Sequence, residues 1–314
     1  MHPLNEKDHA LYELACLLQN TGYTFTTVTP ATHQRVNARP ENAWARDVKD
    51  VFGWSRAFHP DALPGEIWDS MRHAAAVVPT EDGFRPLVRL SSLGGRTFIH
   101  SAFPTTEADA VFFGPDTYRY ALALEELFAS GLARVKRAVD IGTGAGPGAI
   151  LSALRFPDAE VTGVDINPEA LRLTRINAAL AGARNVEARE SNLLRDVEGD
   201  FDLIVSNPPY LIDPSERAYR HGGGPLGAGL SLAILDAALE RLSPNGTLLL
   251  YTGAAMMNGT DPFRLAVEER LSGTNARWNL REIDPDVFGE ELENDAYAEC
   301  DRIAATVLTV RKAD

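Results

Sequence analysis

The sequence DLIVSNPPYLID, residues 202–213, ends an apolar, β-branched run in an asparagine, two prolines and a tyrosine. Neither Pro208 nor Pro209 can donate a backbone N–H, and each restricts the residue before it to extended geometry. Asn207, Pro208 and Tyr210 are therefore predicted to lie in a stiff, non-helical turn directly after a strand. A turn of this kind is either a rigid loop or a preorganised chemical site.

A second segment with chemical potential is VDIGTGAGPG, residues 139–148, between a predicted strand and a predicted helix. Its glycines allow a ligand to approach the backbone closely, and the helix that follows directs free N–H groups at the same place. Asp165 ends the next predicted strand, 23 residues after Gly142. An acidic side chain there can accept hydrogen bonds from both hydroxyls of a ribose. The pair predicts an adenosine-containing cofactor, and the alternative is a tight turn with no ligand.

The glycine spacing distinguishes between two cofactors. The dinucleotide signature G-x-G-x-x-G fails from Gly142 because position 147 is a proline, and it fits from Gly144 only as G-x-G-x-x-A. Asp140 would place a negative charge beside a pyrophosphate, whereas a cationic ligand would be attracted to that carboxylate. S-adenosylmethionine carries an ammonium and a sulfonium group and has no phosphate. The pattern therefore favours S-adenosylmethionine over NAD.

A sheet is needed to position these segments, and from about residue 110 the chain alternates helix-like and strand-like patterns. Strands are expected at 137–142, 160–165, 186–190, 201–206, 247–252, 277–283 and 302–310. Helices are expected at 115–131, 147–156, 168–182, from the loop 221–230 to about 242, and at 262–272, with a turn at 243–246. The order predicts an α/β fold with a seven-stranded, mostly parallel, Rossmann-like sheet and an antiparallel hairpin at its edge.

Residues 1–110 have a different pattern. They are expected to form a smaller α+β domain for substrate recognition, followed by a catalytic domain at 111–314. An amphipathic helix is expected at 8–20, two further helices near 41–52 and 65–77, and two strands around a Gly-Gly turn within 84–103. Helices followed by a hairpin are compatible with a winged-helix module.

The composition is that of a soluble globular protein: 314 residues, 45% hydrophobic, 24% charged, with a net charge of −14. Residues 1–110 contribute −3 and the rest −11, which disfavours binding to a long stretch of nucleic acid. No apolar run is long enough to span a membrane, and the polar N-terminus is no secretory signal. Cys16 and Cys300 lack metal-ligand spacing. We therefore expect a cytoplasmic protein without a membrane segment or a metal.

VDIGTGAG, GVDINPEAL and SNPPY, in this order and spacing, resemble the class I S-adenosylmethionine-dependent methyltransferases. Within that superfamily they are most similar to the enzymes that methylate planar amino groups. The resemblance covers roughly residues 110–310. It narrows to the protein glutamine methyltransferases that act on peptide-release factors, because the loop HGGGPLGAGL is similar to that family's glycine-rich segment after NPPY.

The same family carries an Arg-Pro-Asp/Glu-Thr-Glu stretch before its first strand, which corresponds here to FGPDTYRY. Pro115, Asp116 and Thr117 fit this stretch. Gly114 and Tyr118 replace the flanking arginine and acid. The N-terminal hairpin also departs from the all-helical substrate domain of the family.

The resemblance implies four catalytic residues, Asn207, Pro208, Pro209 and Tyr210. An amide or exocyclic amine is a poor nucleophile because its lone pair is delocalised. The side-chain oxygen of Asn207 and the carbonyl of Pro208 would each accept one N–H of the target and so fix its nitrogen. Tyr210 would stack on the planar acceptor. The implied contacts of S-adenosylmethionine are Asp140, Gly142, Thr143, Gly144, Gly146, Asp165, Ile166, Asn192, Leu193 and Thr117, with Asn192 replacing an aspartate that usually accepts from adenine.

The methyl acceptor stays open between several classes. The sequence supports a protein glutamine amide and an exocyclic amine of an RNA base almost equally as the acceptor, and the acidic net charge slightly favours the protein. A base would have to be unstacked or flipped into the pocket. A small-molecule amine or amide is a third alternative. Outside this class stand an NAD-dependent oxidoreductase, which the glycine spacing and Asp140 disfavour, and a binding module without catalysis.

Overall fold

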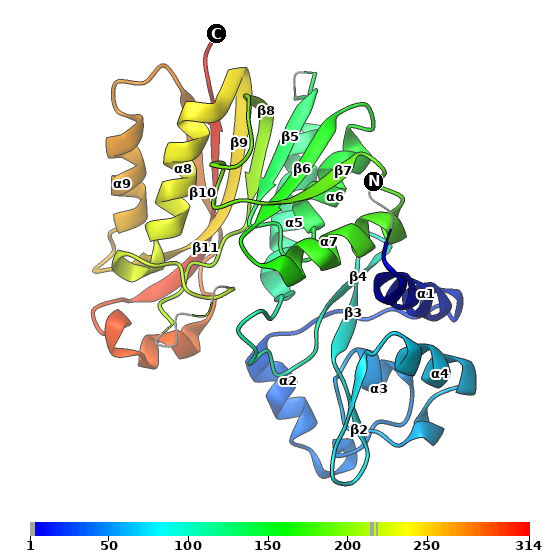
Figure 1. Cartoon of the computed structure of the whole chain (residues 1–314). Helices are drawn as coiled ribbons and strands as arrows, with labels where there is room; N and C mark the ends of the chain where they lie inside the picture. The colour runs from blue at the N-terminus through cyan, green and yellow to red at the C-terminus, as the bar shows by residue number, and fades with distance from the viewer. Residues whose placement is uncertain (1–3, 133, 214–216, 218) are drawn as a thin grey trace.

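The computed structural model describes residues 4–132, 134–213, 217 and 219–314, and its largest element is a seven-stranded sheet (Figure 1). The strand order is β10-β11-β9-β8-β5-β6-β7. Strands β5 to β9 run parallel, and β11 is antiparallel to both β9 and β10. The predicted fold is therefore confirmed. The strands are β5 (Arg137–Ile141), β6 (Glu160–Asp165), β7 (Val186–Glu190), β8 (Phe201–Ser206), β9 (Leu242–Met256), β10 (Arg277–Asp284) and β11 (Arg302–Arg311).

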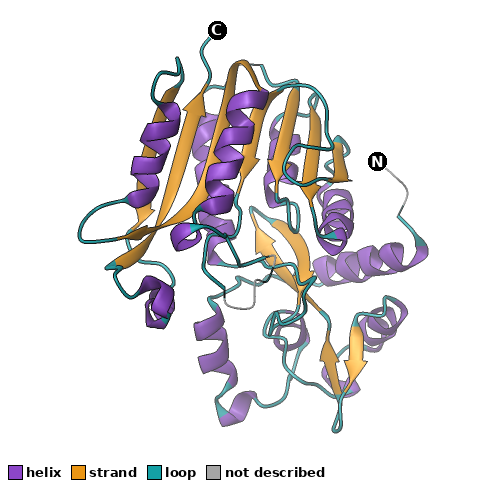
Figure 2. Ribbon diagram, turned by 60° about the vertical axis from the view of Figure 1, so that its left-hand side comes forward, coloured by secondary structure: helices purple, strands orange, loops and turns teal. Residues whose placement is uncertain are grey.

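Helices cover both faces of the sheet (Figure 2). One face packs against α5 (Pro115–Ala129), α6 (Pro147–Arg155) and α7 (Pro168–Ala181), and the other against α8 (Gly229–Arg241) and α9 (Pro262–Leu271). Successive residues of β8 enter different cores, because Leu203 and Val205 join the core under α5–α7 and Ile204 joins the core under α8 and α9. A strand buried on both faces accounts for the continuous apolar run before the NPPY turn.

One stretch of the sheet differs from the prediction. Residues 243–246 were expected to form a turn before a strand, but β9 is continuous from Leu242 to Met256. Leu242 pairs with Phe201, and pairing with β8 resumes only at Thr247. Asn245 has a φ of +61°, so these residues form a bulge inside the strand.

The N-terminal part is an α+β unit, as expected. It contains α1 (Glu6–Asn20), α2 (Pro30–Asn37), α3 (Val48–Phe52), α4 (Gly65–His73) and the hairpins β1 (Val77–Pro79) with β2 (Phe84–Pro86) and β3 (Val88–Leu93) with β4 (Arg96–Ser101). The hairpin around the Gly-Gly turn and the helix at 8–20 are confirmed. The helix expected at 41–52 is a 3-10 turn followed by the short α3, and α2 was not foreseen. The winged-helix interpretation stays a prediction.

Short 3-10 helices lie between the larger elements: η1 (Pro40–Asn42), η2 (Pro60–Ala62), η3 (Pro225–Gly227), η4 (Gly289–Glu293) and η5 (Asp295–Tyr297). In the part of the chain that the structure describes, no helix has both the length and the apolar composition needed to cross a membrane.

Helix α7 joins the N-terminal unit to the sheet. The side chain of Asn177, 1% exposed, accepts from the backbone N–H of Ile99 in β4 at 2.8 Å and donates to the Ile99 carbonyl at 2.9 Å. The same amide nitrogen donates to the carbonyl of Ala145, in the glycine loop, at 2.8 Å. Arg172 of α7 also pairs with Asp8 of α1. The glycine loop and the N-terminal hairpin are thus held by one side chain.

We predict that Asn177→Ala lowers the free energy of unfolding by about 2–4 kcal/mol, because it removes three buried hydrogen bonds and leaves backbone groups without partners. The matched control is Asn185→Ala, whose amide also makes three hydrogen bonds, all of them donated to carbonyls at the corner between α6 and β6. Urea denaturation should show a loss in both variants. Hydrogen exchange at Ile99 should accelerate only in Asn177→Ala, and unchanged exchange there would contradict this role.

Candidate active site

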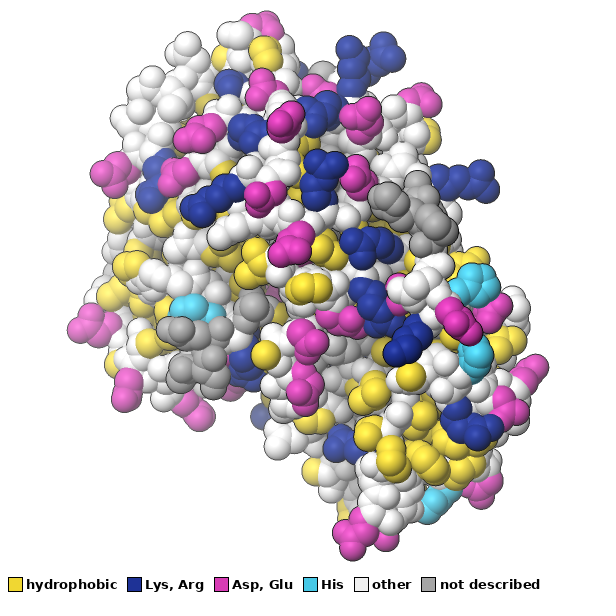
Figure 3. All heavy atoms as spheres, viewed as in Figure 1, with side chains coloured by type: hydrophobic (Ala, Val, Ile, Leu, Met, Phe, Trp, Pro, Cys, Tyr) yellow, Lys and Arg dark blue, Asp and Glu magenta, His cyan; other side chains and the backbone are white. Residues whose placement is uncertain are grey.

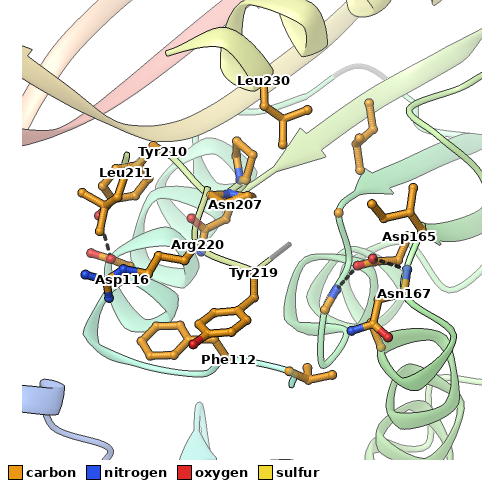
Figure 4. Close-up of a pocket in the computed structure, with 18 of the residues that line it drawn as sticks. Phe112, Asp116, Asp165, Asn167, Asn207, Tyr210, Leu211, Tyr219, Arg220 and Leu230 are labelled. Atoms are coloured by element: carbon orange, nitrogen blue, oxygen red, sulfur yellow. Dashed lines mark hydrogen bonds between the residues drawn. The ribbon is translucent and has the colours of Figure 1, made fainter. Parts of the chain in front are cut away.

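A cavity of about 220 Å³ opens at the carboxyl ends of the parallel strands (Figure 4). Its wall contains the loops after β5, β6 and β8, the first turn of α5 and the residue Phe288. Pro30, at the start of α2, brings the N-terminal unit to the same cavity. Ligands of open α/β sheets bind at this edge, because the strand order reverses there and the loops diverge. The two segments that the sequence singled out therefore meet in one place.

Asp165 lines the cavity on the side opposite Asp116 (Figure 4). Its Oδ2 accepts from the backbone N–H of Gly144 at 3.0 Å, and its Oδ1 accepts from the N–H of Asn167 at 2.9 Å (Figure 4). Burial raises the pKa of Asp165, and these backbone donors oppose the rise. Gly142 and Gly144 present bare backbone, because a Cβ at either position would meet no atom within 4 Å. A ligand can therefore lie directly on the glycine loop.

The other predicted cofactor contacts divide into two groups. Ile166, Asn192, Leu193 and Thr117 line the cavity together with Asp165, Gly142 and Gly144. Three others, Asp140, Thr143 and Gly146, are buried and are not among the described residues that line the cavity. Their direct contact with a cofactor stays a prediction.

Asp140 holds the glycine loop together from behind. Its carboxylate is fully buried and accepts from Oγ1 of Thr143 at 2.8 Å, from the N–H of Ala149 at 2.9 Å and from the hydroxyl of Tyr120 at 3.3 Å. Burial raises the pKa of Asp140 to about 7. The side chain thus ties the loop to the first turn of α6 and to α5.

The NPPY turn follows β8 and contributes Asn207, Pro208, Pro209 and Tyr210 to the cavity wall. Figure 4 shows Asn207 beside the cavity. Within the described residues, neither the side-chain oxygen of Asn207 nor the carbonyl of Pro208 accepts a hydrogen bond. These two oxygens are therefore available to a ligand, and their contact with a methyl acceptor stays a prediction.

The hydroxyl of Tyr210 has a partner that the sequence did not predict. Its side chain is 6% exposed, and its hydroxyl donates to Oδ2 of Asp116 at 2.7 Å. Sequence reasoning matched Asp116 to a family stretch but gave it no role. The two residues are 94 positions apart, so no local pattern could pair them. Stacking of Tyr210 on an acceptor stays a prediction.

The glycine-rich loop after NPPY packs on the turn itself. Gly222 donates its N–H to the carbonyl of Leu211 at 2.8 Å, and Leu230 donates to the carbonyl of Gly222 at 2.7 Å. A Cβ at Gly227 would overlap the carbonyl group of Tyr210. The glycines therefore allow one backbone to close against another.

Sequence reasoning also missed an aromatic pair at the cavity. The rings of Phe112 and Tyr219 are stacked, with centroids 6.2 Å apart and planes at 15°, and both residues line the cavity. Arg220, beside them, binds Glu291. Isolated aromatic residues before α5 and in a loop carry no periodic signal, so only the fold brings them together.

No group of three or more His, Cys, Asp or Glu side chains in the described residues is arranged to hold a metal ion. Charged side chains that line the cavity are Asp116, Asp165 and Arg220.

The chain was compared with known proteins. The family model of the methyltransferase small domain matches residues 121–257. The release factor glutamine methyltransferase of Deinococcus radiodurans is 36% identical over 246 residues, covering 74% of this chain and 78% of that protein. This chain belongs to the same methyltransferase family. The aligned stretch of 246 residues is longer than the predicted catalytic domain at 111–314. The match of this methyltransferase to its relative therefore extends into the N-terminal part, where the sequence motifs showed little resemblance.

Two other likenesses are more partial. The ribosomal protein uL3 glutamine methyltransferase of Bordetella pertussis is 38% identical over 149 residues, which span 41% of this methyltransferase and 50% of that relative. The structure of Trm5 from Methanocaldococcus jannaschii with adenosine has a TM-score of 0.50 at 15% identity, covering 73% of this chain and 57% of that chain. Trm5b from Pyrococcus abyssi has a TM-score of 0.50 at 17% identity, covering 76% and 62%. These two structures show the fold alone.

We predict that Gly227→Ala destabilises the methyltransferase more than Gly223→Ala. Both residues have positive φ, +79° and +66°, so both substitutions carry a backbone cost of about 1–2 kcal/mol. Only at Gly227 would the new Cβ also overlap the NPPY backbone, whereas the nearest atom at Gly223 is 3.9 Å away. Urea denaturation should show an extra loss of about 2 kcal/mol for Gly227→Ala. Equal losses would mean that the loop does not press on the turn.

Proposed function

We propose that this protein transfers a methyl group from S-adenosylmethionine to the side-chain amide of a glutamine in a protein. The proposal is carried by two oxygens, on Asn207 and Pro208, that accept no hydrogen bond from any described residue and lie beside the cavity that Asp165 also lines. An amide NH₂ group has two N–H donors in one plane and matches two such acceptors. The names of the relatives, glutamine methyltransferases of release factors and of ribosomal protein uL3, support this acceptor.

The cavity residues suit an adenosine group without phosphates. Asp165 offers carboxylate oxygens for ribose hydroxyls, and Asn192 offers an amide oxygen for the adenine amino group. Arg220 is the one cationic side chain among the described residues that line the cavity, and it is paired with Glu291. The described lining therefore offers no unpaired cationic side chain to bind a pyrophosphate. When bound, S-adenosylmethionine supplies a methyl group activated on a sulfonium. Asp140 lies close behind the glycine loop, where its carboxylate accepts from Thr143 and from the N–H of Ala149.

Asn207 and Pro208 would act by orientation and by electrostatics. Accepting both N–H groups fixes the amide nitrogen and turns its lone-pair direction toward the methyl carbon. The two oxygens also favour the positive charge that develops on nitrogen during transfer. Pro208 and Pro209 fix their own φ and restrict the residue before each of them to extended geometry, so the turn that carries both acceptors is stiff before the substrate arrives. No general base is needed before the methyl group has moved, since the proton leaves the nitrogen afterwards.

A protein acceptor agrees with the surface charge. The face in Figure 3 shows acidic and basic side chains interspersed, with no continuous basic surface of the kind that RNA binding uses. Pro30 brings the N-terminal unit to the cavity, which supports a division into a substrate-recognition domain at 1–110 and a catalytic domain at 111–314. A release factor or a ribosomal protein is a cytoplasmic substrate, so we place the enzyme in the cytoplasm.

We predict that Asn207→Ala lowers methyl transfer at least about 100-fold, because one of two preorganised acceptors is lost, while S-adenosylmethionine still binds. Asp165→Ala should instead weaken cofactor binding, seen as a raised dissociation constant for S-adenosylmethionine. Calorimetry measures binding, and incorporation of labelled methyl groups measures transfer. Normal turnover by Asn207→Ala would refute the proposed role of the turn.

A further inference from the structure

A buried carboxylate lies directly behind the NPPY turn. Asp116 is 6% exposed, and its Oδ2 accepts from the hydroxyl of Tyr210 at 2.7 Å (Figure 4). Its Oδ1 accepts from the hydroxyl of Tyr251 at 2.6 Å and from Nη1 of Arg119 at 3.2 Å. This one carboxylate therefore joins the turn to α5 and to β9.

Asp116 is itself held in place. It lies in the first turn of α5, where the N–H of Gly114 donates to Oγ1 of Thr117 at 3.3 Å. Arg119 reaches from Asp116 to Asp284 of β10, with an ion-pair distance of 2.8 Å. The positive end of α5 and the guanidinium both compensate the buried negative charge. Burial raises the pKa of Asp116, whereas the two tyrosine hydroxyls and Arg119 lower it.

The ring of Tyr210 is enclosed on several sides. A Cβ at Gly253 of β9 would overlap this ring, so the absence of a side chain at 253 makes room for it. The rings of Tyr251 and Phe288 lie with centroids 6.4 Å and 6.1 Å away. A ring enclosed in this way has few alternative rotamers, and the position of its hydroxyl fixes the backbone to which it is attached.

We propose that Asp116 is a positioning residue for methyl transfer, and that it acts through the hydroxyl of Tyr210 to fix the carbonyl of Pro208. The inference rests on the proposed function and assigns Tyr210 a different part from stacking. Tyr210 follows the two prolines directly, so a shift of its backbone moves the Pro208 carbonyl along a stiff connection. A displacement of about 1 Å at a reacting group is enough to cost about 100-fold in rate.

Tyr251 provides an internal control. It donates to the same carboxylate as Tyr210, over a similar distance, but it lies in β9 and does not line the cavity. Tyr210→Phe and Tyr251→Phe each delete one hydroxyl and one hydrogen bond to Asp116. A purely structural role of Asp116 makes the two variants equivalent, whereas a positioning role separates them.

The test measures initial rates with methyl-tritiated S-adenosylmethionine and an extract of cells that lack the enzyme. The full-length variants are Tyr210→Phe, Tyr251→Phe and Asp116→Asn. We expect Tyr210→Phe and Asp116→Asn to lower the maximal rate about 10- to 100-fold with the KM for S-adenosylmethionine unchanged. Tyr251→Phe should keep the maximal rate within about twofold. Both tyrosine variants should lose a similar amount of thermal stability.

Two outcomes overturn the inference. Equal maximal rates in Tyr210→Phe and Tyr251→Phe would show that the carboxylate only stabilises the fold. A raised KM with an unchanged maximal rate would place Tyr210 in cofactor binding instead. Asn207→Ala, assayed in parallel, separates this result from a failure of the proposed function, because full activity of that variant refutes the acceptor site itself.

Discussion

Two oxygens that accept no hydrogen bond from the described residues, the side-chain oxygen of Asn207 and the backbone carbonyl of Pro208, are the constraint on which this site depends. A strand normally continues its ladder into the next residues, and a free carbonyl beside it would be satisfied there. The prolines after Asn207 prevent this, because they cannot supply the N–H groups that a continued ladder requires. The Pro208 carbonyl thus stays available beside the cavity, which the side chain of Asn207 also lines.

Keeping those oxygens available places demands on distant parts of the chain. The glycine-rich loop must come close enough to press on Tyr210 and Leu211, which only residues without a side chain permit. The first turn of α5 supplies the carboxylate that receives the tyrosine hydroxyl. Strand β6 ends on the same side with Asp165, which accepts from the N–H of Asn167, the N-cap of α7. Helix α7 in turn anchors the N-terminal hairpin through Asn177. The sheet brings these elements together at its carboxyl edge.

The fold could be predicted from the sequence because its signals are local. Apolar runs bounded by glycine turns predicted all seven strands of the large sheet, and prolines marked the starts of its helices. Asp165 and Asn207 lie at the ends of β6 and β8, as predicted. Helix α2 was missed because PATHQRVN has no apolar face. Its sequence signals are limited to Thr29 at the N-cap and Pro30 at the first helical position. The bulge at Asn245 resembled a turn because its residue types are those of a turn.

The site could be predicted only in part, for a related reason. Glycines and prolines indicate the local backbone geometry. A hydrogen bond such as that between Tyr210 and Asp116 joins side chains 94 residues apart, so no local pattern indicates it. Asp140 shows the converse case. Its charge suggested contact with a ligand, which stays a prediction, and no sequence pattern indicated that its carboxylate accepts hydrogen bonds from Thr143 and Tyr120 behind the loop. Residue type indicates which groups can react, and packing decides which of them face the cavity.

The most direct test of this account identifies the methyl acceptor. Purified protein is incubated with methyl-tritiated S-adenosylmethionine and an extract of cells lacking the enzyme, and portions are treated with protease or with RNase. The account predicts macromolecular label that protease removes, that RNase leaves, and that acid hydrolysis releases as methylamine, the product expected from a methylated glutamine amide. Label that RNase removes, or label confined to small molecules, would contradict it.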